Sequence, residues 1–163
     1  MQSSIVKIVD LETLYSFTDI IKNSFRTVAD QYNLTDENSP TNPAFTTVEN
    51  LKKIASQSEC FGVYINEIPC GFFALERATV HGTFYLERVC VLPEYRHRGI
   101  GTSILNFAET YCKNNNAEKI SIGIMNQNIT LKKWYQQNGY IGISVKYFPH
   151  LKFEVCFLEN RLK

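Results

Sequence analysis

The sequence predicts one α/β domain built on a mixed, mostly antiparallel sheet, and three observations carry this prediction. A chain of 163 residues is long enough to form one sizeable hydrophobic core but too short to form two stable ones, so we expect residues 1–163 to form a single domain. Apolar residues alternate over 61–65 and 68–75 around a short turn, which predicts a β-hairpin. Strand patterns at 83–92 and 120–124 flank a helical pattern, and a crossover helix of this length makes the two strands parallel neighbours.

The N-terminal third is predicted to hold one strand and two helices. Apolar residues alternate over residues 5–9, as in a short strand. Asp10 is a candidate N-cap, because the apolar residues after it recur at helical spacing. These residues are Leu11, Leu14, Phe17, Ile21, Phe25 and Val28. Residues 34–44 carry small polar residues and two prolines, so we expect a loop. Thr46 and Glu49 then form a candidate capping box for the second helix.

The C-terminal half is predicted to alternate helices with strands. A helical stripe starts near Gly99 and ends in the asparagines at 114–116. A second helical pattern ends at Gly139, which we expect to adopt the left-handed conformation that closes a helix. Two final strands are predicted at 141–147 and 153–158.

Composition and charge exclude several classes of partner. The 17 basic and 16 acidic side chains leave a formal net charge of +1, and no run of like charge occurs, so no nucleic-acid-binding surface is expected. No segment is apolar over the length of a membrane span or a signal peptide, so we expect a cytoplasmic protein with no membrane partner. Five cysteines without a C-x-x-C pair are expected to be reduced thiols, and three scattered histidines show no metal-ligand spacing.

The segment between the strand that ends at Pro93 and the following helix has the features of an anion site. It comprises Arg96, His97, Arg98, Gly99, Ile100, Gly101 and Thr102. Glycine lets a backbone approach a ligand closely, and the first amides of a helix have no intrahelical partner. The helix dipole, the arginines and the hydroxyl of Thr102 would add to the attraction. The alternative is an ordinary turn whose arginines are solvated. The Walker and dinucleotide-binding glycine patterns are both absent from the sequence.

Two segments together resemble the acetyl-CoA motifs of the GNAT superfamily of N-acetyltransferases. Residues 86–102, Leu-Glu-Arg-Val-Cys-Val-Leu-Pro-Glu-Tyr-Arg-His-Arg-Gly-Ile-Gly-Thr, contain the family's pyrophosphate-binding pattern R/Q-x-x-G-x-G/A. Residues 128–140 resemble the family's segment N-x-x-A-x-x-L-Y-x-x-x-G-F, in register at the asparagine, tyrosine and glycine. Leu131 and Trp134 stand where the family usually has alanine and leucine. The resemblance implies a mixed sheet of about seven strands, with a splayed parallel pair and about four flanking helices.

The resemblance also implies roles for individual residues. The backbone of Val89, Cys90 and Val91 would meet the pantetheine arm of acetyl-CoA, and the Val89 amide would polarise the thioester carbonyl. Asn128 would contact the cofactor from the neighbouring element, and Tyr135 would protonate the leaving thiolate. Tyr135 has an alternative role as a core aromatic residue, because its helix must pack on the sheet. Acetyl-CoA is the co-substrate, and no metal is implied.

Glu87 is the candidate general base, and the residue pattern gives it independent support. Glu87 and Arg88 are consecutive in a central strand, so one charge is expected on each face, and buried charges are paired or functional. Tyr85 falls on the face of Glu87 and would share or relay the proton. The alternative for Glu87 is a structural ion pair across the sheet. The triplet Leu-Glu-Arg occurs at both 75–77 and 86–88, and we interpret this repetition as chance.

The implied reaction is transfer of an acetyl group to a primary amine of a small molecule or peptide, by direct attack in a ternary complex. In the family the acceptor site lies between the first helices and the last hairpin, which correspond here to residues 25–45 and 147–153. One alternative is a non-catalytic regulatory module that binds acyl-CoA. Another is a transferase that moves a different acyl group or acts on a hydroxyl. A homodimer is compatible with the resemblance.

Overall fold

A seven-stranded sheet forms the centre of the computed structural model, which describes residues 2–163. Within these residues the strands lie in the order β1-β2-β3-β4-β5-β7-β6 and five α-helices cover them. The strands are β1 (Ser3–Lys7), β2 (Glu59–Ile65), β3 (Ile68–Arg77), β4 (Thr83–Val91), β5 (Lys119–Met125), β6 (Ile141–Lys146) and β7 (Val155–Arg161). The helices are α1 (Leu11–Ser16), α2 (Thr18–Gln31), α3 (Val48–Gln57), α4 (Ile100–Asn114) and α5 (Ile129–Gln137), with short 3₁₀ helices η1 (Pro43–Phe45) and η2 (Pro93–Tyr95).

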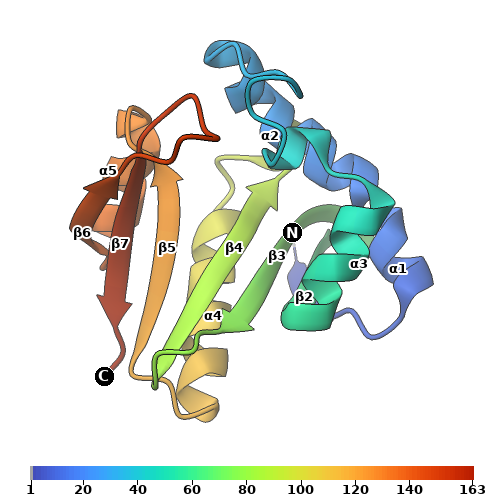
Figure 1. The fold of residues 1–163 in the computed structure, drawn as a ribbon. Coiled ribbons are helices and arrows are strands. Elements are labelled where there is room, and N and C mark those ends of the chain that lie inside the picture. The colour runs from blue at the N-terminus through green and yellow to red at the C-terminus, as the bar shows by residue number, and fades with distance from the viewer. Residues whose placement is uncertain (1) are drawn as a thin grey trace.

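The sheet opens between β4 and β5, its parallel pair. The two strands pair over Thr83–Tyr85 and Lys119–Ser121, and beyond these residues they diverge (Figure 1). Each of the other neighbouring pairs among the described strands is antiparallel. This arrangement confirms the predicted mixed sheet with a splayed parallel pair.

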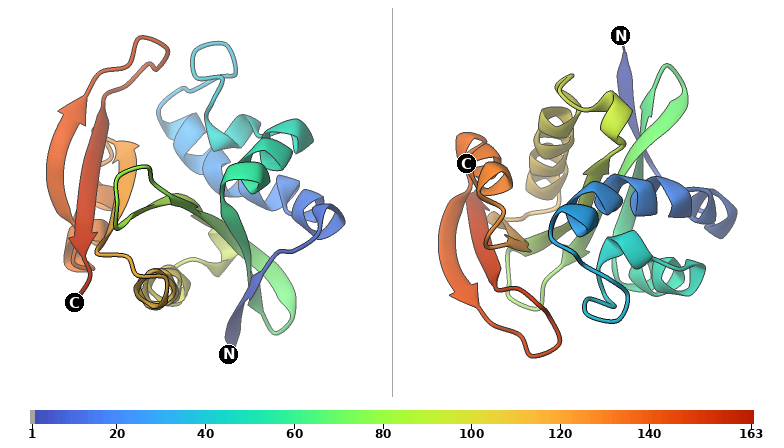
Figure 2. Two further views of the ribbon diagram at one scale, coloured as in Figure 1. Left: turned by 60° about the horizontal axis from the view of Figure 1, so that its bottom comes forward. Right: turned by 90° about the horizontal axis from the view of Figure 1, so that it is seen from above.

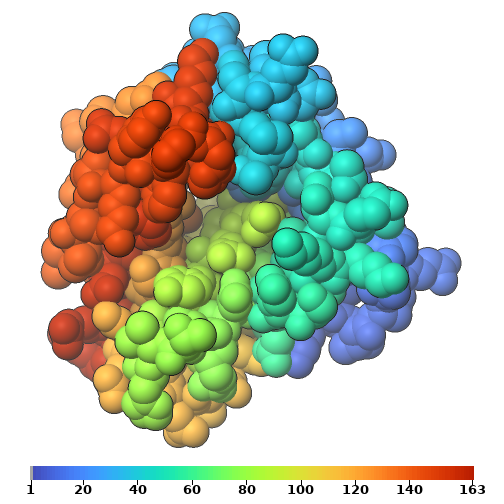
Figure 3. Space-filling view, viewed as in Figure 1, coloured from blue at the N-terminus to red at the C-terminus, as the bar shows by residue number. Residues whose placement is uncertain are grey.

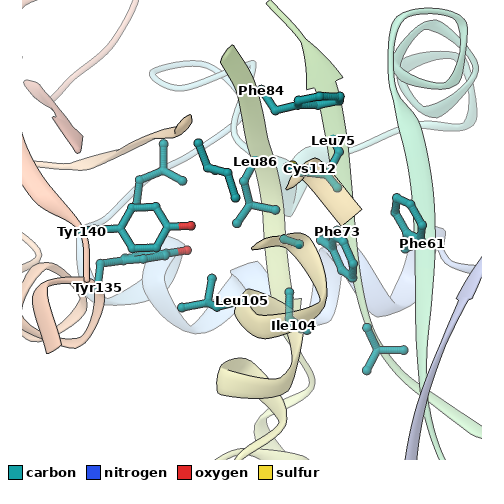
Figure 4. Close-up of a cluster of buried hydrophobic side chains, with 14 of the residues drawn as sticks. Phe61, Phe73, Leu75, Phe84, Leu86, Ile104, Leu105, Cys112, Tyr135 and Tyr140 are labelled. Atoms are coloured by element: carbon teal, nitrogen blue, oxygen red, sulfur yellow. The ribbon is translucent and has the colours of Figure 1, made fainter. Parts of the chain in front are cut away.

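Helices cover both faces of the sheet. Figure 2 shows α1, α2 and α3 on one face and α4 on the other. The cluster of buried residues beneath α4 and α5 includes Phe61, Phe73, Leu86, Ile104 and Tyr135 (Figure 4). The cluster beneath α1, α2 and α3 includes Phe17, Ile21, Leu51, Phe72 and Cys90. Because β4 contributes to both clusters, its middle is enclosed by helices on both faces.

The first predicted helix is divided in two at Phe17. The amide of Phe17 donates to the carbonyl of Leu14 at 3.0 Å, which tightens and ends α1. The hydroxyl of Thr18 donates to the carbonyl of Tyr15 at 2.7 Å. Side-chain hydroxyls that bond to nearby carbonyls compete with the helical ladder and weaken a helix at that point. The prediction of one continuous helix over 11–28 was wrong at this position.

Of the two predicted helix caps, the structure confirms the first and places the second one residue later. Asp10 caps α1 as expected, because its Oδ1 accepts from the amide three residues later at 2.8 Å. The capping box of α3 lies one residue later than expected. Thr47 and Asn50 exchange the two bonds, at 3.2 and 3.0 Å, that were predicted for Thr46 and Glu49. Thr46 is buried directly after η1, which leaves Thr47 as the first residue free to cap.

All five cysteines, at 60, 70, 90, 112 and 156, are buried and free of disulfides. Over residues 2–163, no helix combines the length and the apolar character that crossing a membrane requires. The same residues contain no group of three or more His, Cys, Asp or Glu side chains arranged to hold a metal ion.

Candidate active site

A cleft of about 530 Å³ opens where β4 and β5 diverge. Its walls come from both strands, from α5, and from residues between 25 and 43 and between 151 and 157, which include parts of both segments expected at the acceptor site. In Figure 3 it is the hollow whose yellow-green floor is β4, between the orange-red segment before β7 and the cyan segment after α2. The cleft brings together Tyr85, Glu87, Arg88, Val89, Asn128 and Tyr135. Candidate residues from the two motifs at 86–102 and 128–140 therefore line the same cleft.

β4 contains a β-bulge at Arg88. Ala74 of β3 faces Glu87 and Phe72 faces Cys90, so β4 carries one extra residue between these two pairs. Arg88 has a φ of +54°, a left-handed conformation that costs a side-chain-bearing residue about 1–3 kcal/mol. The bulge overturns the expectation of one charge on each face of the strand. The two side chains contact each other instead, with Oε2 of Glu87 3.4 Å from Nη1 of Arg88.

Glu87 is a partly exposed carboxylate on the wall of the cleft. Burial raises its pKa above the ordinary value of 4.5, the Arg88 guanidinium lowers it, and the Glu76 carboxylate raises it through charge and a hydrogen bond. The net effect is a raised pKa, which makes the ionised carboxylate a stronger base. Tyr85 lines the same cleft. The ion pair weighed as an alternative role for Glu87 forms with its neighbour in the chain rather than across the sheet.

Glu76 is a site residue that the sequence analysis missed. Glu76 pairs with Tyr85 across antiparallel β3 and β4, and Ala74 pairs with Glu87, so Glu76 and Glu87 are diagonal neighbours on one face of the sheet. No local pattern in the sequence indicates this contact, because it depends on the register of β3 and β4. That register brings the carboxylates of Glu76 and Glu87 within hydrogen-bonding reach of each other.

Beyond its contact with β5, β4 has amides available to a ligand. The amide of Leu92 donates to the carbonyl of Cys70 on β3 at 2.8 Å. Because successive residues direct their N–H groups to opposite edges of a strand, the amides of Val91 and Val89 point toward the diverging β5. The same alternation turns the Cys90 amide toward β3. Burial raises the pKa of the Cys90 thiol to about 12, which keeps it protonated and unsuited to act as a nucleophile.

The loop before α4 presents backbone amides at the start of that helix. His97 and Gly99 have φ values of +61° and +80°, which turn the chain from η2 into α4. The first intrahelical bond runs from the Ser103 amide to the Gly99 carbonyl at 3.0 Å, and no side chain of residues 2–163 caps the helix. The amides of residues 100–102 are therefore available, as expected for an anion site.

The side chains of this loop differ in what they offer a ligand. Ile100 is buried in the core, with 3% of its surface exposed, so its amide faces the loop while its side chain does not. His97, Arg98 and Thr102 are exposed around the start of the helix. The guanidinium of Arg98 lies over the ring of Tyr95, 5.6 Å from its centroid.

The side chain of Arg96 donates hydrogen bonds to α2 rather than facing the start of α4. Its Nε donates to the Val91 carbonyl at 2.9 Å and its Nη2 to the Ser24 carbonyl at 2.6 Å. Its Nη1 donates to the hydroxyl of Thr27 at 3.1 Å, and its amide to the Pro93 carbonyl at 3.2 Å. This geometry does not favour the predicted pyrophosphate contact of Arg96. The arginine instead joins the end of β4 to the helix that forms one wall of the cleft.

Gly101 lies against the indole of Trp134. A Cβ atom on Gly101 would stand 2.9 Å from Cζ2 of Trp134 and 3.2 Å from Cη2. Real side chains do not pack this closely, so the start of α4 and the middle of α5 fit together only with glycine at this position. The second glycine of the loop is therefore required by packing of the two helices, independently of any ligand.

Replacing Gly101 by Ala is expected to lower the free energy of unfolding by about 1–3 kcal/mol, because the added methyl overpacks the contact with Trp134. Replacing Trp134 by Leu as well should relieve the clash, so the double variant should be more stable than the two single changes predict by addition. Urea unfolding of the four proteins gives the coupling free energy. Thr102→Ala, on the exposed side of the same turn, is the control. Additive changes at Gly101 and Trp134 would contradict the contact.

The end of α5 holds Tyr135 against Tyr140. The Tyr140 amide donates to the Tyr135 carbonyl at 3.1 Å and the Gly139 amide to the Gln136 carbonyl at 3.2 Å. With Gly139 at a φ of +92°, these bonds form a Schellman motif and confirm the predicted left-handed end of the helix. The two rings lie edge to face, 5.4 Å apart. Figure 4 shows both hydroxyls directed toward β4.

Tyr135 is both a core aromatic residue and a cleft residue. It is 5% exposed and lines the cleft, whereas Tyr140 is 1% exposed and does not line it. Burial raises the pKa of Tyr135 well above its ordinary value of 10, so the hydroxyl stays protonated at neutral pH, as a general acid must. Asn128 fixes the other end of this helix, because its Oδ1 accepts from the Leu131 amide at 3.2 Å. Its predicted contact with the cofactor stays a prediction.

Comparisons with known proteins bear on the family. A model of the acetyltransferase (GNAT) family matches residues 17–140. The uncharacterized N-acetyltransferase YjcF of Bacillus subtilis (strain 168) is 29% identical over 109 residues, which cover 64% of this chain and 74% of that protein. The solved structure of PaiA N-acetyltransferase from Thermoplasma acidophilum, in complex with coenzyme A, has a TM-score of 0.76 over 99% of both chains at 18% identity.

A second solved structure gives a partial match. It is a putative streptothricin acetyltransferase from Bacillus anthracis str. Ames in complex with acetyl coenzyme A, with a TM-score of 0.60 and 17% identity over 66% of this chain and 64% of that one. The family match spans β4, the loop before α4, and α5 as far as Tyr140, which are the elements that build the cleft and the free helix start. The chain therefore belongs to the GNAT family of acetyltransferases.

Proposed function

We propose that the protein transfers the acetyl group of acetyl-CoA to a primary amine in a ternary complex. The observation that carries this proposal is the cleft itself. At the divergence of β4 and β5 it collects a carboxylate with a raised pKa, a strand edge with unpaired amides, and a buried protonated tyrosine. These are a base, an oxyanion-stabilising donor and an acid, which acyl transfer from a thioester to an amine requires.

The start of α4 is the proposed site for the pyrophosphate of acetyl-CoA. Its amides at 100–102 have no intrahelical acceptor, and His97 and Arg98 are exposed beside them. Two structures of similar fold contain coenzyme A or acetyl-CoA, which supports the same ligand here. The pantetheine arm would then run along the free edge of β4, where the Val89 and Val91 amides are directed.

The proposed reaction forms a C–N bond and breaks the C–S bond of the thioester. Glu87 accepts a proton from the attacking amine, directly or through water. The Val89 amide donates to the carbonyl oxygen as negative charge develops on it. Tyr135 donates its proton to the departing thiolate and regains one from solvent. The products are one N-acetylated amine and one free coenzyme A thiol for each acetyl-CoA consumed.

Acetyl-CoA is expected to raise the Tm, because a ligand that binds only the folded chain stabilises it by about 2.7 kcal/mol at a hundred times its Kd. S-acetylpantetheine, which lacks the pyrophosphate and the nucleotide, should raise the Tm far less at the same concentration. Differential scanning fluorimetry with both compounds makes the comparison. No shift at saturating acetyl-CoA would contradict the proposed function, and equal shifts would remove the proposed role of the α4 start.

A further inference from the structure

A second cleft of about 350 Å³ lies between α3 and the β3–β4 hairpin. Its wall toward the first cleft is made of Thr41, Asn42, Glu87 and Arg88, which line both spaces. Glu87, the proposed base, therefore stands at the border. A molecule seated in the second cleft reaches the reaction centre from the side opposite to β5.

The second cleft contains charges of both signs in equal number. Glu76 and Glu87 line it from the strands, Arg88 from the bulge, and Lys53 from α3. A dication would place one of its charges against Arg88 or Lys53, and a dianion would meet the two carboxylates. Like charges brought together in a partly desolvated site are strongly disfavoured. The charge pattern instead matches a ligand that carries one positive and one negative group.

Arg88 has unused capacity to bind an anion. Its side chain is 26% exposed, and one bond of its guanidinium goes to Glu87 through Nη1. Its Nε is buried and has no hydrogen-bond partner among residues 2–163. The guanidinium also lies near enough to Cys60 of β2 to lower that thiol's pKa, although burial dominates and raises it to about 11. The side chain lines the second cleft as well as the first. A guanidinium carries five N–H donors in a fixed fork, so the partly exposed guanidinium of Arg88 is suited to bind a carboxylate beside Glu87.

We propose that the second cleft binds an amino acid as the acetyl acceptor, with its carboxylate on Arg88 and its amine beside Glu87. This proposal rests on the proposed acetyl transfer and adds the chemical class of the amine. The amine and carboxylate of an amino acid are joined through one carbon, and Glu87 and Arg88 are adjacent on the bulge. The volume of about 350 Å³ accommodates a free amino acid.

Binding of the carboxylate also changes the state of the base. In the free protein Glu87 is paired with Arg88 at 3.4 Å. An acceptor carboxylate that occupies Arg88 weakens this pair, which raises the affinity of Glu87 for a proton. Glu87 then takes the proton of the ammonium group, the freed amine attacks the thioester carbon, and coenzyme A leaves as the thiol. Recognition and proton removal are thereby coupled through one arginine.

Matched acceptors test this proposal on the unaltered protein. Each amino acid of a panel is compared with its methyl ester and with the amine left by removing its carboxylate, for example phenylalanine with 2-phenylethylamine, by following thiol release and N-acetyl product. We expect kcat/KM for the best amino acid to exceed that of both partners by on the order of 10- to 10²-fold, the range that hydrogen bonds to a charged group contribute. Equal or faster acetylation of the partners would overturn the amino acid proposal and leave acetyl transfer standing. Absence of any acetylated product would overturn both.

Variants at Arg88 separate binding of the carboxylate from effects on the fold. Arg88→Gln should raise KM for the amino acid by on the order of 10- to 10²-fold, much more than for the decarboxylated amine, and leave acetyl-CoA affinity unchanged. Arg88→Lys should restore part of the affinity. Lys52→Gln, which removes an exposed cation of α3 outside both clefts, is the control and should change neither value. An equal rise in KM for amino acid and amine would contradict the assignment. A variant that fails to fold leaves the comparison of matched acceptors decisive.

Discussion

Replacing Tyr135 by Phe is expected to lower kcat for acetyl transfer by about 10²-fold or more, the usual contribution of a positioned general acid. The phenyl ring retains the buried contacts of Tyr135 with Trp134 and Tyr140. The hydroxyl that faces the cleft is lost, so the departing thiolate must find a proton elsewhere. Acetyl-CoA affinity should remain unchanged. Steady-state kinetics combined with calorimetric titration of acetyl-CoA gives both quantities.

Tyr140→Phe is a closely matched control for this change. The two rings are neighbours, and the Tyr140 hydroxyl is buried without a hydrogen-bond partner among residues 2–163. Removing an unpaired buried hydroxyl should leave kcat unchanged and slightly stabilise the fold. Equal kcat losses in both variants would assign Tyr135 to packing. An equal loss of acetyl-CoA affinity in the Tyr135 variant would do the same.

Replacing Glu87 by Gln is expected to lower kcat/KM by about 10²-fold or more and to change its dependence on pH. The base must be ionised, so activity of the wild-type protein should rise with pH through the pKa of Glu87. Burial and Glu76 raise that pKa, so the rise should lie above the range of an ordinary glutamate. The glutamine variant should lack this limb of the profile. A profile with an unchanged acid limb would show that another group is the base.

Glu76→Gln provides the companion experiment. It removes a like charge beside Glu87 and replaces an acidic neighbour with an amide that can donate a hydrogen bond to the carboxylate. Both changes lower the pKa of Glu87, so the acid limb should move to lower pH while the variant stays active. An acid limb at unchanged pH would show that Glu76 does not influence the pKa of Glu87.

Much of the fold followed from local patterns in the sequence. The hairpin of β2 and β3, the parallel pair and the left-handed Gly139 each depend on periodicity or on a single turn residue, and the structure confirms them. The helix break at Phe17 was missed because it arises where hydroxyls bond to carbonyls in place of the ladder, while the apolar spacing continues through it.

Features of the candidate site could be predicted only where they depend on residues that are neighbours in the sequence. The amides at the start of α4 follow from a helix start with glycines, whereas the bonds of Arg96 to α2 link residues about seventy positions apart. The bulge at Arg88 shifts the faces of β4 by one residue, and no local pattern indicates it. The contact of Glu76 with Glu87 required the register of β3 and β4. The motifs named a candidate acid, base and anion site, and these roles stay predictions, while the mutual geometry of the residues could not be read from the motifs.

Incubating the protein with acetyl-CoA and a panel of primary amines, while thiol and N-acetylated product are measured together, tests acetyl transfer most directly. We expect at least one amine to accelerate thiol release and to yield one N-acetylated product for each thiol. If acetyl-CoA raises the Tm but no amine in the panel accelerates thiol release above the amine-free rate, the chain binds acetyl-CoA without transferring its acetyl group, and the central claim is wrong.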